Sequence, residues 1–527
     1  MIVLASRRVP EIVLAMAGLV HRLRAQVGQA PGPSCKGPSI ARGICQTPGV
    51  VLTMHCRELF QMSAGARINW SAAFTPLHPR SCEGRRRLCG ARALGALRRI
   101  KVRVPFRLPA ALGLWVSFTF AARADDWPQF RGPNRDSVWN ETGILQTFPA
   151  EGLKIRWRAP VGPGWSSPVV VRGRVYVTDM RLEKPRAWER IQCLKESTGK
   201  RLWSYASELV YPEWAFIPEH GGGPAATPIV ENGKIYSLGR NGQVDCLDAR
   251  SGKVIWEISL GRKYEIRELI CRGSPLIEGN LLILFTGARP GACVIALDKQ
   301  RGKEVWKALD DSVSNSSPLM IVAGGKRQLI VWTGESVTSL NPATGETWWR
   351  EAMVTSSNDS IPTPVVQNNR LLISGLMLEL DARTPTAKVL WPESLGISKR
   401  ILSNTSNPLL QGDYVYSAKS NGELVCLDAG TGRQVWGTTH VMELKFGASI
   451  HLTPNGDATF LFTDEGNLIL ARLTPGGYRE ISRVHLLEPT SDLGTRKFAW
   501  VPPVYANRCV FARNDRELVC ASLAAKP

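Results

Sequence analysis

The chain has 527 residues, of which 44% are hydrophobic and 21% are charged, and this composition is typical of a globular protein and excludes a chain that is disordered throughout. No apolar run reaches the roughly 18 to 20 residues that a bilayer-spanning helix requires, so we exclude a polytopic membrane protein. The net charge is +21, but residues 1–123 hold 19 Lys and Arg against three acidic residues, whereas the remainder holds 47 against 42. Because the body is nearly balanced, charge gives no argument for a nucleic-acid partner, and we expect none.

Residues 98–124 have the three parts of a secretory signal peptide: a basic start, an apolar centre and a cleavage site of small residues. The apolar stretch 108–121 is 14 residues long, which is too short to span a bilayer but is typical of a signal peptide. We predict cleavage after Ala124. The mature protein is then periplasmic or secreted and is not integral to a membrane.

Residues 1–97 form a basic leader that is rich in Arg, Cys, Gly and Ser and shows no sustained helix or strand periodicity. A signal peptide does not normally follow so long a stretch, so we interpret the leader as translated upstream sequence from a start site assigned too early. The alternative is a disordered basic extension with a single-pass anchor at 108–121.

The body, residues 125–527, consists of repeats, and one half of each unit ends in Trp with Gly four residues before it and Leu nine residues before it. Examples are LDARSGKVIW at 247–256 and LDAGTGRQVW at 427–436, whereas LDARTPTAKVLW at 380–391 carries a two-residue insertion and no glycine. The other half begins with a proline and a β-branched run. These first-half positions number eight: Pro168, Pro228, Pro275, Pro318, Pro364, Pro408 and Pro503, with Leu452 in the place of proline in one unit.

Each unit is expected to form four short antiparallel strands. The Asn-Gly pairs at 241–242 and 421–422 favour tight hairpins because both turn residues need a positive φ. Successive Trp residues lie 42 to 53 residues apart, which fits four-stranded blades arranged radially. We therefore predict an all-β protein, an eight-bladed β-propeller, in residues 125–527.

The last unit, Pro503 to Leu523, lacks a fourth strand. We predict that the strand around Trp157 completes this blade and closes the ring, with DDWPQFRGP at 125–133 packed nearby. The Trp of each unit is expected to pack between neighbouring blades. These structural residues are Trp157, Trp203, Trp256, Trp306, Trp349, Trp391 and Trp436.

The repeats resemble the pyrroloquinoline-quinone (PQQ) repeat, the tryptophan-docking blade of quinoprotein dehydrogenases and of BamB-type outer-membrane assembly proteins. The D-A-x-T/S-G-x-x-x-W segments carry this resemblance. DWPQFRGP at 126–133, GGGPAATPIVENGKIYSLG at 221–239 and SSPLMIVAGGKRQLIVWTGE at 316–335 are similar to the secreted PQQ-like propellers of planctomycete-type bacteria, most of which lack a demonstrated activity.

The resemblance to quinoprotein dehydrogenases implies a quinone held between an adjacent Cys-Cys disulfide and a stacked Trp, with Ca²⁺ on carboxylate and amide oxygens and an Asp as base. This chain has no adjacent Cys-Cys pair, so we transfer no catalytic residue, and it lacks the Cys that anchors BamB after its signal, since 120–126 read FAARADD. We expect a non-catalytic extracytoplasmic scaffold that binds an envelope or secreted protein or a ligand, without cofactor or metal. The alternative is a PQQ- and calcium-dependent alcohol or sugar dehydrogenase with an atypical site.

Two groups of residues are candidates for binding. Glu213, Trp214 and His220 lie in the longest connection between units, where a titratable pair, aromatics and glycines suit a binding loop, although a loop that merely covers the channel needs the same features. The second group stands near the starts of the innermost strands and is expected to line one mouth of the channel, as a binding site or as a water-filled funnel. It comprises Arg272, Asn315, Asn407 and His451.

The cysteines of the body indicate neither zinc nor covalent haem, because no C-x-x-C pair occurs. Cys193, Cys246, Cys426 and Cys520 share one repeat position and are expected to be buried between blades. Cys509 lies close enough to Cys520, across one turn, for a disulfide in an oxidising compartment, although the predicted register makes the two diagonal.

Overall fold

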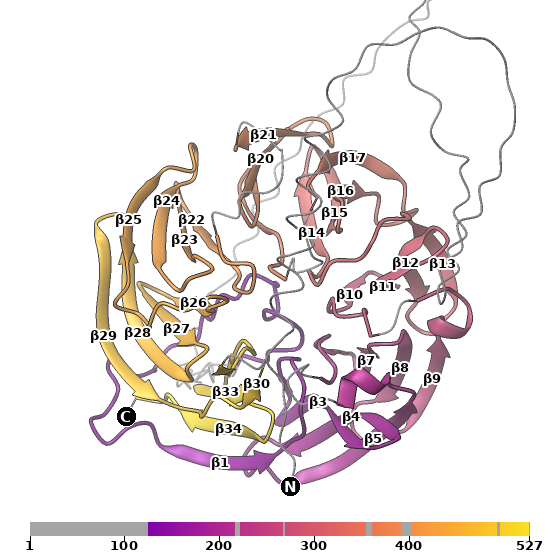
Figure 1. Cartoon of the computed structure of the whole chain (residues 1–527), viewed down its shortest axis with the longest axis horizontal. Helices are drawn as coiled ribbons and strands as arrows, with labels where there is room; N and C mark the ends of the chain where they lie inside the picture. The colour runs from indigo at the N-terminus through magenta and orange to yellow at the C-terminus, as the bar shows by residue number, and fades with distance from the viewer. Residues whose placement is uncertain are drawn as a thin grey trace, which may run out of the picture. The chain divides into compact units, whose positions relative to one another are not determined.

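The computed structural model describes residues 125–216, 222–266, 269–354, 361–392, 402–492 and 496–525, so the leader and the signal peptide lie outside the described residues. Residues 125–525 contain eight four-stranded antiparallel sheets, arranged as blades around a central channel (Figure 1). The predicted eight-bladed β-propeller is therefore confirmed. No helix in the described part of the chain is both long enough and apolar enough to cross a membrane.

The blades follow one another in chain order, and the first strand of each blade is the innermost. Blade 1 is β2 (Val169–Val171), β3 (Arg174–Glu183), β4 (Arg186–Lys195) and β5 (Arg201–Leu209). Blade 2 is β6 (Ile229–Glu231), β7 (Lys234–Leu238), β8 (Gln243–Asp248) and β9 (Val254–Ser259). Blade 3 is β10 (Leu276–Glu278), β11 (Leu281–Ala288), β12 (Ala292–Asp298) and β13 (Glu304–Ala308). Blade 4 is β14 (Leu319–Ala323), β15 (Lys326–Trp332), β16 (Ser336–Leu340) and β17 (Thr347–Ala352).

The second half of the ring has the same order. Blade 5 is β18 (Val365–Gln367), β19 (Arg370–Ile373), β20 (Leu376–Leu380) and β21 (Ala387–Trp391). Blade 6 is β22 (Leu409–Gln411), β23 (Tyr414–Ala418), β24 (Leu424–Asp428) and β25 (Gln434–Thr438). Blade 7 is β26 (Ile450–Asn455), β27 (Ala458–Thr463), β28 (Asn467–Thr474) and β29 (Gly477–His485). Blade 8 is β32 (Val504–Ala506), β33 (Cys509–Arg513), β34 (Glu517–Ser522) and β1 (Ile155–Pro160).

Short elements stand between some blades. A two-stranded sheet of β30 (Ser491–Asp492) and β31 (Lys497–Phe498) precedes blade 8. Two 3-10 helices, η1 (Glu213–Phe216) and η3 (Leu260–Arg262), follow the outermost strands of blades 1 and 2. The repeat pattern did not predict these elements.

The ring closes through β1, as predicted. This strand pairs with β34 in antiparallel register, with Trp157 opposite Cys520 and Ala159 opposite Leu518. Closure gives the last blade its fourth strand from the amino-terminal side of the chain and leaves β34 without a free edge.

The Trp residues that end the units mostly bind the next blade. In six of them the indole Nε1 donates to a backbone carbonyl of the following blade, either at the end of its third strand or in the turn between its third and fourth strands. The pairs are Trp157 to Glu196, Trp203 to Ala249, Trp256 to Lys299, Trp306 to Pro342, Trp391 to Ala429 and Trp436 to Thr474.

The repeat glycine makes this docking possible because the indole lies directly on it. A Cβ at Gly302 would come within 2.7 Å of the Trp256 ring, and one at Gly345 within 2.6 Å of Trp306. Both glycines also have a positive φ. Trp349 is the exception: blade 5 carries the insertion and no glycine in this turn, and the Trp349 indole instead donates to Gln328 Oε1 of its own blade at 2.9 Å.

The cysteines are buried, and all seven in the described residues are free. Cys509 lies opposite Ser522, and Cys520 lies opposite Phe511, so the two are diagonal as the predicted register required.

Residues 125–148, which we call the N-terminal segment, cross the ring without forming a strand of their own (Figure 1). Trp127 pairs with Val170 of blade 1, and the Pro128 carbonyl accepts from Val230 of blade 2. Arg135 donates to the carbonyls of Pro275 and Pro318 at 2.9 and 3.2 Å. Farther along, Trp139 N donates to Pro454 O of blade 7, and Asn507 N of blade 8 donates to Glu141. The prediction placed this segment only near the closing strand, whereas it links blades around the ring.

Candidate functional site

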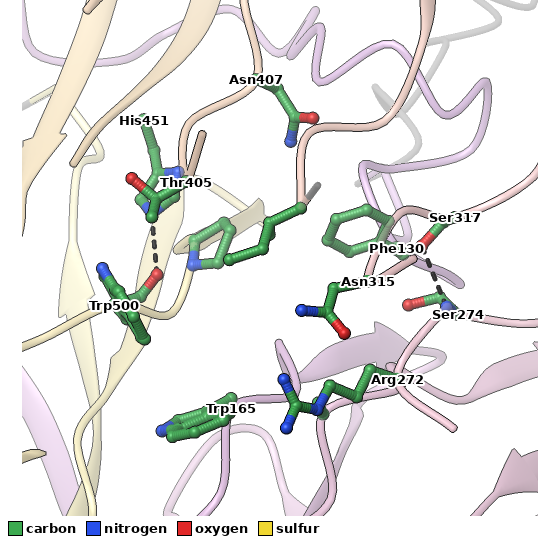
Figure 2. A pocket seen from close by; sticks show the side chains of 13 residues that line it. Phe130, Trp165, Arg272, Ser274, Asn315, Ser317, Thr405, Asn407, His451 and Trp500 are labelled. Atoms are coloured by element: carbon green, nitrogen blue, oxygen red, sulfur yellow. Dashed lines mark hydrogen bonds between the residues drawn. The ribbon is translucent and has the colours of Figure 1, made fainter. Parts of the chain in front are cut away.

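A cavity of about 250 Å³ lies at one end of the channel (Figure 2). With the exceptions of Phe130 and of His451, which is the second residue of β26, its lining comes from the ends of the connections that lead from the outermost strand of one blade to the innermost strand of the next. We call the side of the ring with these connections the connection face. The lining residues are Phe130, Trp165, Ala225, Arg272, Ser274, Asn315, Ser317, Ile361, Thr405, Asn407, His451, Trp500 and Pro502.

The positions of these residues follow the repeat. Measured from the proline that begins each unit, or from Leu452, the lining comes from one residue before it or three residues before it. Successive side chains on an extended strand point to opposite faces, so these two positions share one direction, toward the channel.

Aromatic side chains form much of the wall. Trp165 and Trp500 meet edge to face, with ring centroids 5.8 Å apart and an interplanar angle of 82°. The ring of Phe498 packs against that of Trp500, with the two ring centroids 4.5 Å apart. Phe130, from the N-terminal segment, adds a third ring on another side of the cavity (Figure 2). Flat apolar surfaces of this kind suit an aromatic or otherwise planar apolar group.

Positive charge stands on the face of Trp165. The guanidinium of Arg272 lies 5.9 Å from its ring centroid, and that of Arg240 lies 5.8 Å away. Arg240 is fully buried and donates two hydrogen bonds to Leu269 O, at 3.2 and 2.9 Å, so its role is structural. Arg272 lines the cavity and supplies its cation.

Much of the polar lining holds the blades together. The residue before the repeat proline accepts a hydrogen bond from the backbone N–H of the equivalent residue in the preceding blade. These bonds run from Ser167 to Thr227 at 3.0 Å, from Thr227 to Ser274 at 3.0 Å, from Ser274 to Ser317 at 2.9 Å and from Thr363 to Asn407 at 2.6 Å. The Ser, Thr and Asn side chains at this position therefore have a structural function in addition to lining the cavity.

His451 takes the same position in blade 7 but binds differently. Its Nε2 lies 2.8 Å from the carbonyl oxygen of Trp500. Because a carbonyl can only accept, Nε2 carries the proton and Nδ1 is unprotonated. Burial lowers the pKa of His451 to about 4, although the hydrogen bond to Trp500 opposes this shift. His451 is therefore neutral at physiological pH and is unsuited to carry a proton in a reaction there.

The cavity lining has few groups that could take part in a reaction. Within the described residues it contains no Asp, Glu, Cys or Lys, and none of its hydroxyls, those of Ser274, Ser317 and Thr405, is hydrogen-bonded to His451. Calcium prefers several carboxylate oxygens, which this lining does not supply, and the described residues hold no cluster of three or more His, Cys, Asp or Glu that could bind a metal. The residues present therefore do not fit a calcium–quinone site.

The structure brings together one predicted group and not the other. Arg272, Asn315, Asn407 and His451 all line the cavity, which is where the channel-mouth prediction placed them. Glu213 lies apart from it, in η1, with an exposed carboxylate 3.1 Å from Lys184 Nζ. The position of His220 and the side chain of Trp214 lie outside the described residues.

The sequence reasoning missed the aromatic walls. Trp165 and Trp500 lie three residues before their repeat prolines, the same place as Arg272 and Asn315, so comparison of that position across all units was the available signal. Phe130 stands outside the repeat, and no periodicity pointed to it.

A family model described as outer membrane protein assembly factor BamB matches residues 187–438. BamB of Moranella endobia is 26% identical over 260 residues, which are 45% of this chain and 61% of that protein. Quinoprotein alcohol dehydrogenase PedH of Pseudomonas putida is 35% identical over 157 residues, which are 27% of this chain and 26% of that protein. The matches thus span about three fifths of the BamB relatives and about a quarter of PedH.

The solved structures agree on the fold. The quinohemoprotein alcohol dehydrogenase from Comamonas testosteroni aligns with a TM-score of 0.51 and 14% identity, covering 76% of this chain and 81% of that chain. At this identity the likeness shows the fold alone.

Proposed function

We propose that this chain, which is a PQQ-like β-propeller, acts outside the cytoplasm as a non-catalytic scaffold that binds a protein partner on its connection face. The observation that carries the proposal is the chemistry of the cavity on this face. Its walls are aromatic and its polar groups are an arginine, amides, hydroxyls and a neutral histidine, which can bind and orient a group, while no hydroxyl of the lining is hydrogen-bonded to the histidine.

Exposed apolar side chains on the same face support a macromolecular partner. Val210 follows β5 and is 92% exposed, Val354 follows β17 and is 61% exposed, and Phe446 lies between β25 and β26 and is 93% exposed. All three stand in connections that lead to innermost strands, hence on the face that holds the cavity. Large exposed apolar side chains of this kind are typical of protein-binding surfaces.

The comparisons agree with a partner in the cell envelope. The name of the BamB relatives describes them as outer membrane protein assembly factors. We carry over from them only what this name states, a role in the assembly of outer membrane proteins.

The test uses a photo-crosslinking amino acid at Phe446, with Val322 as the matched control. Val322 is 67% exposed and lies near the far end of β14, on the side of the ring opposite the connections. We expect a discrete crosslinked species from position 446 in cells and none from position 322. Equal crosslinking from both positions, or none from 446, would contradict the proposal.

A second candidate function is the quinone-dependent dehydrogenase, which the match to PedH favours although the cavity lining supplies no carboxylate for calcium. A ligand present at 100 times its dissociation constant stabilises the native state by about 2.7 kcal/mol. Thermal unfolding with PQQ and Ca²⁺ therefore separates the two functions. The scaffold predicts no shift in Tm, whereas a rise that Trp165→Ala abolishes would show that the cavity binds the quinone and would favour the dehydrogenase.

A further inference from the structure

We infer that Glu141 is the receptor for a new amino terminus, the α-ammonium group that forms when the leader is removed between Ala124 and Asp125. The backbone nitrogen of Asp125 donates to Glu141 Oε1 at 2.8 Å. In the unprocessed chain this nitrogen is a neutral amide. After cleavage it is a primary amine, which is protonated at neutral pH.

The covalent step is a hydrolysis by a secretory signal peptidase. Water adds to the Ala124 carbonyl and the C–N bond to Asp125 breaks. Ala124 leaves with the new carboxylate, and the Asp125 nitrogen takes up both protons of the water and becomes an ammonium group. No oxidant, metal or further reactant is required.

Glu141 is suited to receive a cation because its present hydrogen-bond donors are neutral. The side chain is 9% exposed, and its carboxylate accepts from the backbone N–H groups of Asn507 and Arg508 as well as Asp125. A buried carboxylate is costly without a charge partner. Cleavage turns one of the three donors into a cation without moving it, and a charge-assisted hydrogen bond is stronger than a neutral one.

A purely structural role explains two of these bonds. Asn507 and Arg508 form the turn between β32 and β33, and their φ values of 55° and 53° lie in the left-handed region. A carboxylate that accepts from both of their N–H groups stabilises this turn. The turn does not explain the third donor. That donor belongs to the residue that directly follows the small-residue cleavage motif of the sequence.

The contact also bears on the cavity. The chain is fixed immediately after Asp125, because Asp126 Oδ1 accepts from Arg172 N at 2.9 Å and Trp127 pairs with Val170. Phe130, a wall of the cavity, lies five residues from the amino terminus that cleavage creates. An ammonium–carboxylate pair at Asp125 thus anchors the free end of the segment that completes the binding site, so processing and site assembly are linked.

The experiment expresses the full chain in a bacterium that exports it, reads the amino terminus by intact mass, and measures how fast an acylating reagent labels the α-amine as pH is varied. We expect the terminus at Asp125. We also expect the labelling midpoint about one unit above the usual value of about 8, and so labelling about tenfold slower at neutral pH. Glu141→Gln restores the usual midpoint, whereas Glu151→Gln, a change at an exposed position nearby, does not.

A terminus at any residue other than Asp125 would overturn the inference, as would the usual midpoint in the wild-type protein. The wild-type midpoint decides the question even when Glu141→Gln fails to fold. A simple loss of stability in Glu141→Gln does not count in favour, because the turn at Asn507 and Arg508 predicts it equally.

Discussion

Replacing the repeat glycine of blade 3 tests whether indole docking holds neighbouring blades together. In Gly302→Ala the new Cβ lies 2.7 Å from Trp256 Cε3, and the alanine must also adopt the backbone φ of 68° that Gly302 has. The matched control is Gly279→Ala in the same blade, where φ is 57° and a Cβ meets nothing within 4 Å. The two variants share the backbone penalty and differ in the contact with Trp256.

The expected magnitudes follow from these contacts. An alanine in the left-handed region costs about 1 to 2 kcal/mol, which is the whole effect at Gly279. At Gly302, overpacking against the indole adds about 1 to 3 kcal/mol. Loss of the 3.1 Å hydrogen bond from Trp256 Nε1 to Lys299 O adds about 1 kcal/mol. Gly302→Ala is therefore expected to lose about 2 to 4 kcal/mol more than Gly279→Ala.

Urea unfolding followed by far-ultraviolet circular dichroism measures this difference as a change in the transition midpoint at constant slope. Equal losses of stability in the two variants would refute a role for indole docking. The left-handed backbone alone would then explain why the repeats keep a glycine at a fixed distance before the Trp. A change in slope would instead show that blades unfold separately.

Two further predictions concern a buried histidine and a buried arginine. The pKa of His451 is about 4 in the folded protein and about 6.5 in the unfolded protein, so the unfolded state binds more protons between these pH values. The contribution of His451 to stability is therefore fully present above pH 6.5 and falls by about 3 kcal/mol as the pH drops to 4. Urea unfolding at a series of pH values measures this decline, and His451→Asn is expected to remove it. Arg135→Met leaves the Pro275 and Pro318 carbonyls without their donor and is expected to lower the free energy of unfolding by about 2 to 4 kcal/mol. The control, Arg250→Met at an exposed position, is expected to change the urea midpoint little. Equal effects of the two changes would show that the N-terminal segment contributes no stability through Arg135.

The repeat predicted the ring because its signals are local. A glycine four residues before a Trp marks a turn that must be left-handed, and this requirement can be read from neighbouring residues, whereas the indole that lies on the glycine comes from the preceding blade. The fourth strand of blade 8 was also predictable, because a unit with three strands needs a partner and only the segment around Trp157 was left to supply it.

The N-terminal segment was not predictable in this way. Among its contacts, the side chains of Arg131 and Arg135 donate to the backbone carbonyls of Pro364, Pro275 and Pro318. Every sequence has backbone carbonyls, so nothing in the residue types marks these acceptors. Four channel-mouth residues could be predicted, because the position of a residue within the repeat decides to which face of the extended chain its side chain points. They are Arg272, Asn315, Asn407 and His451. Trp165 and Trp500 share that phase, but the reasoning had assigned Trp residues to packing between blades.

The pairing of β1 with β34 has a consequence for synthesis. The chain emerges amino terminus first, so β1 is among the earliest strands to leave the ribosome, whereas its partner is made last. Until Glu517–Ser522 have been translated, β1 has no edge to join. A propeller truncated before β34 therefore keeps two unpaired edges that invite association with other chains.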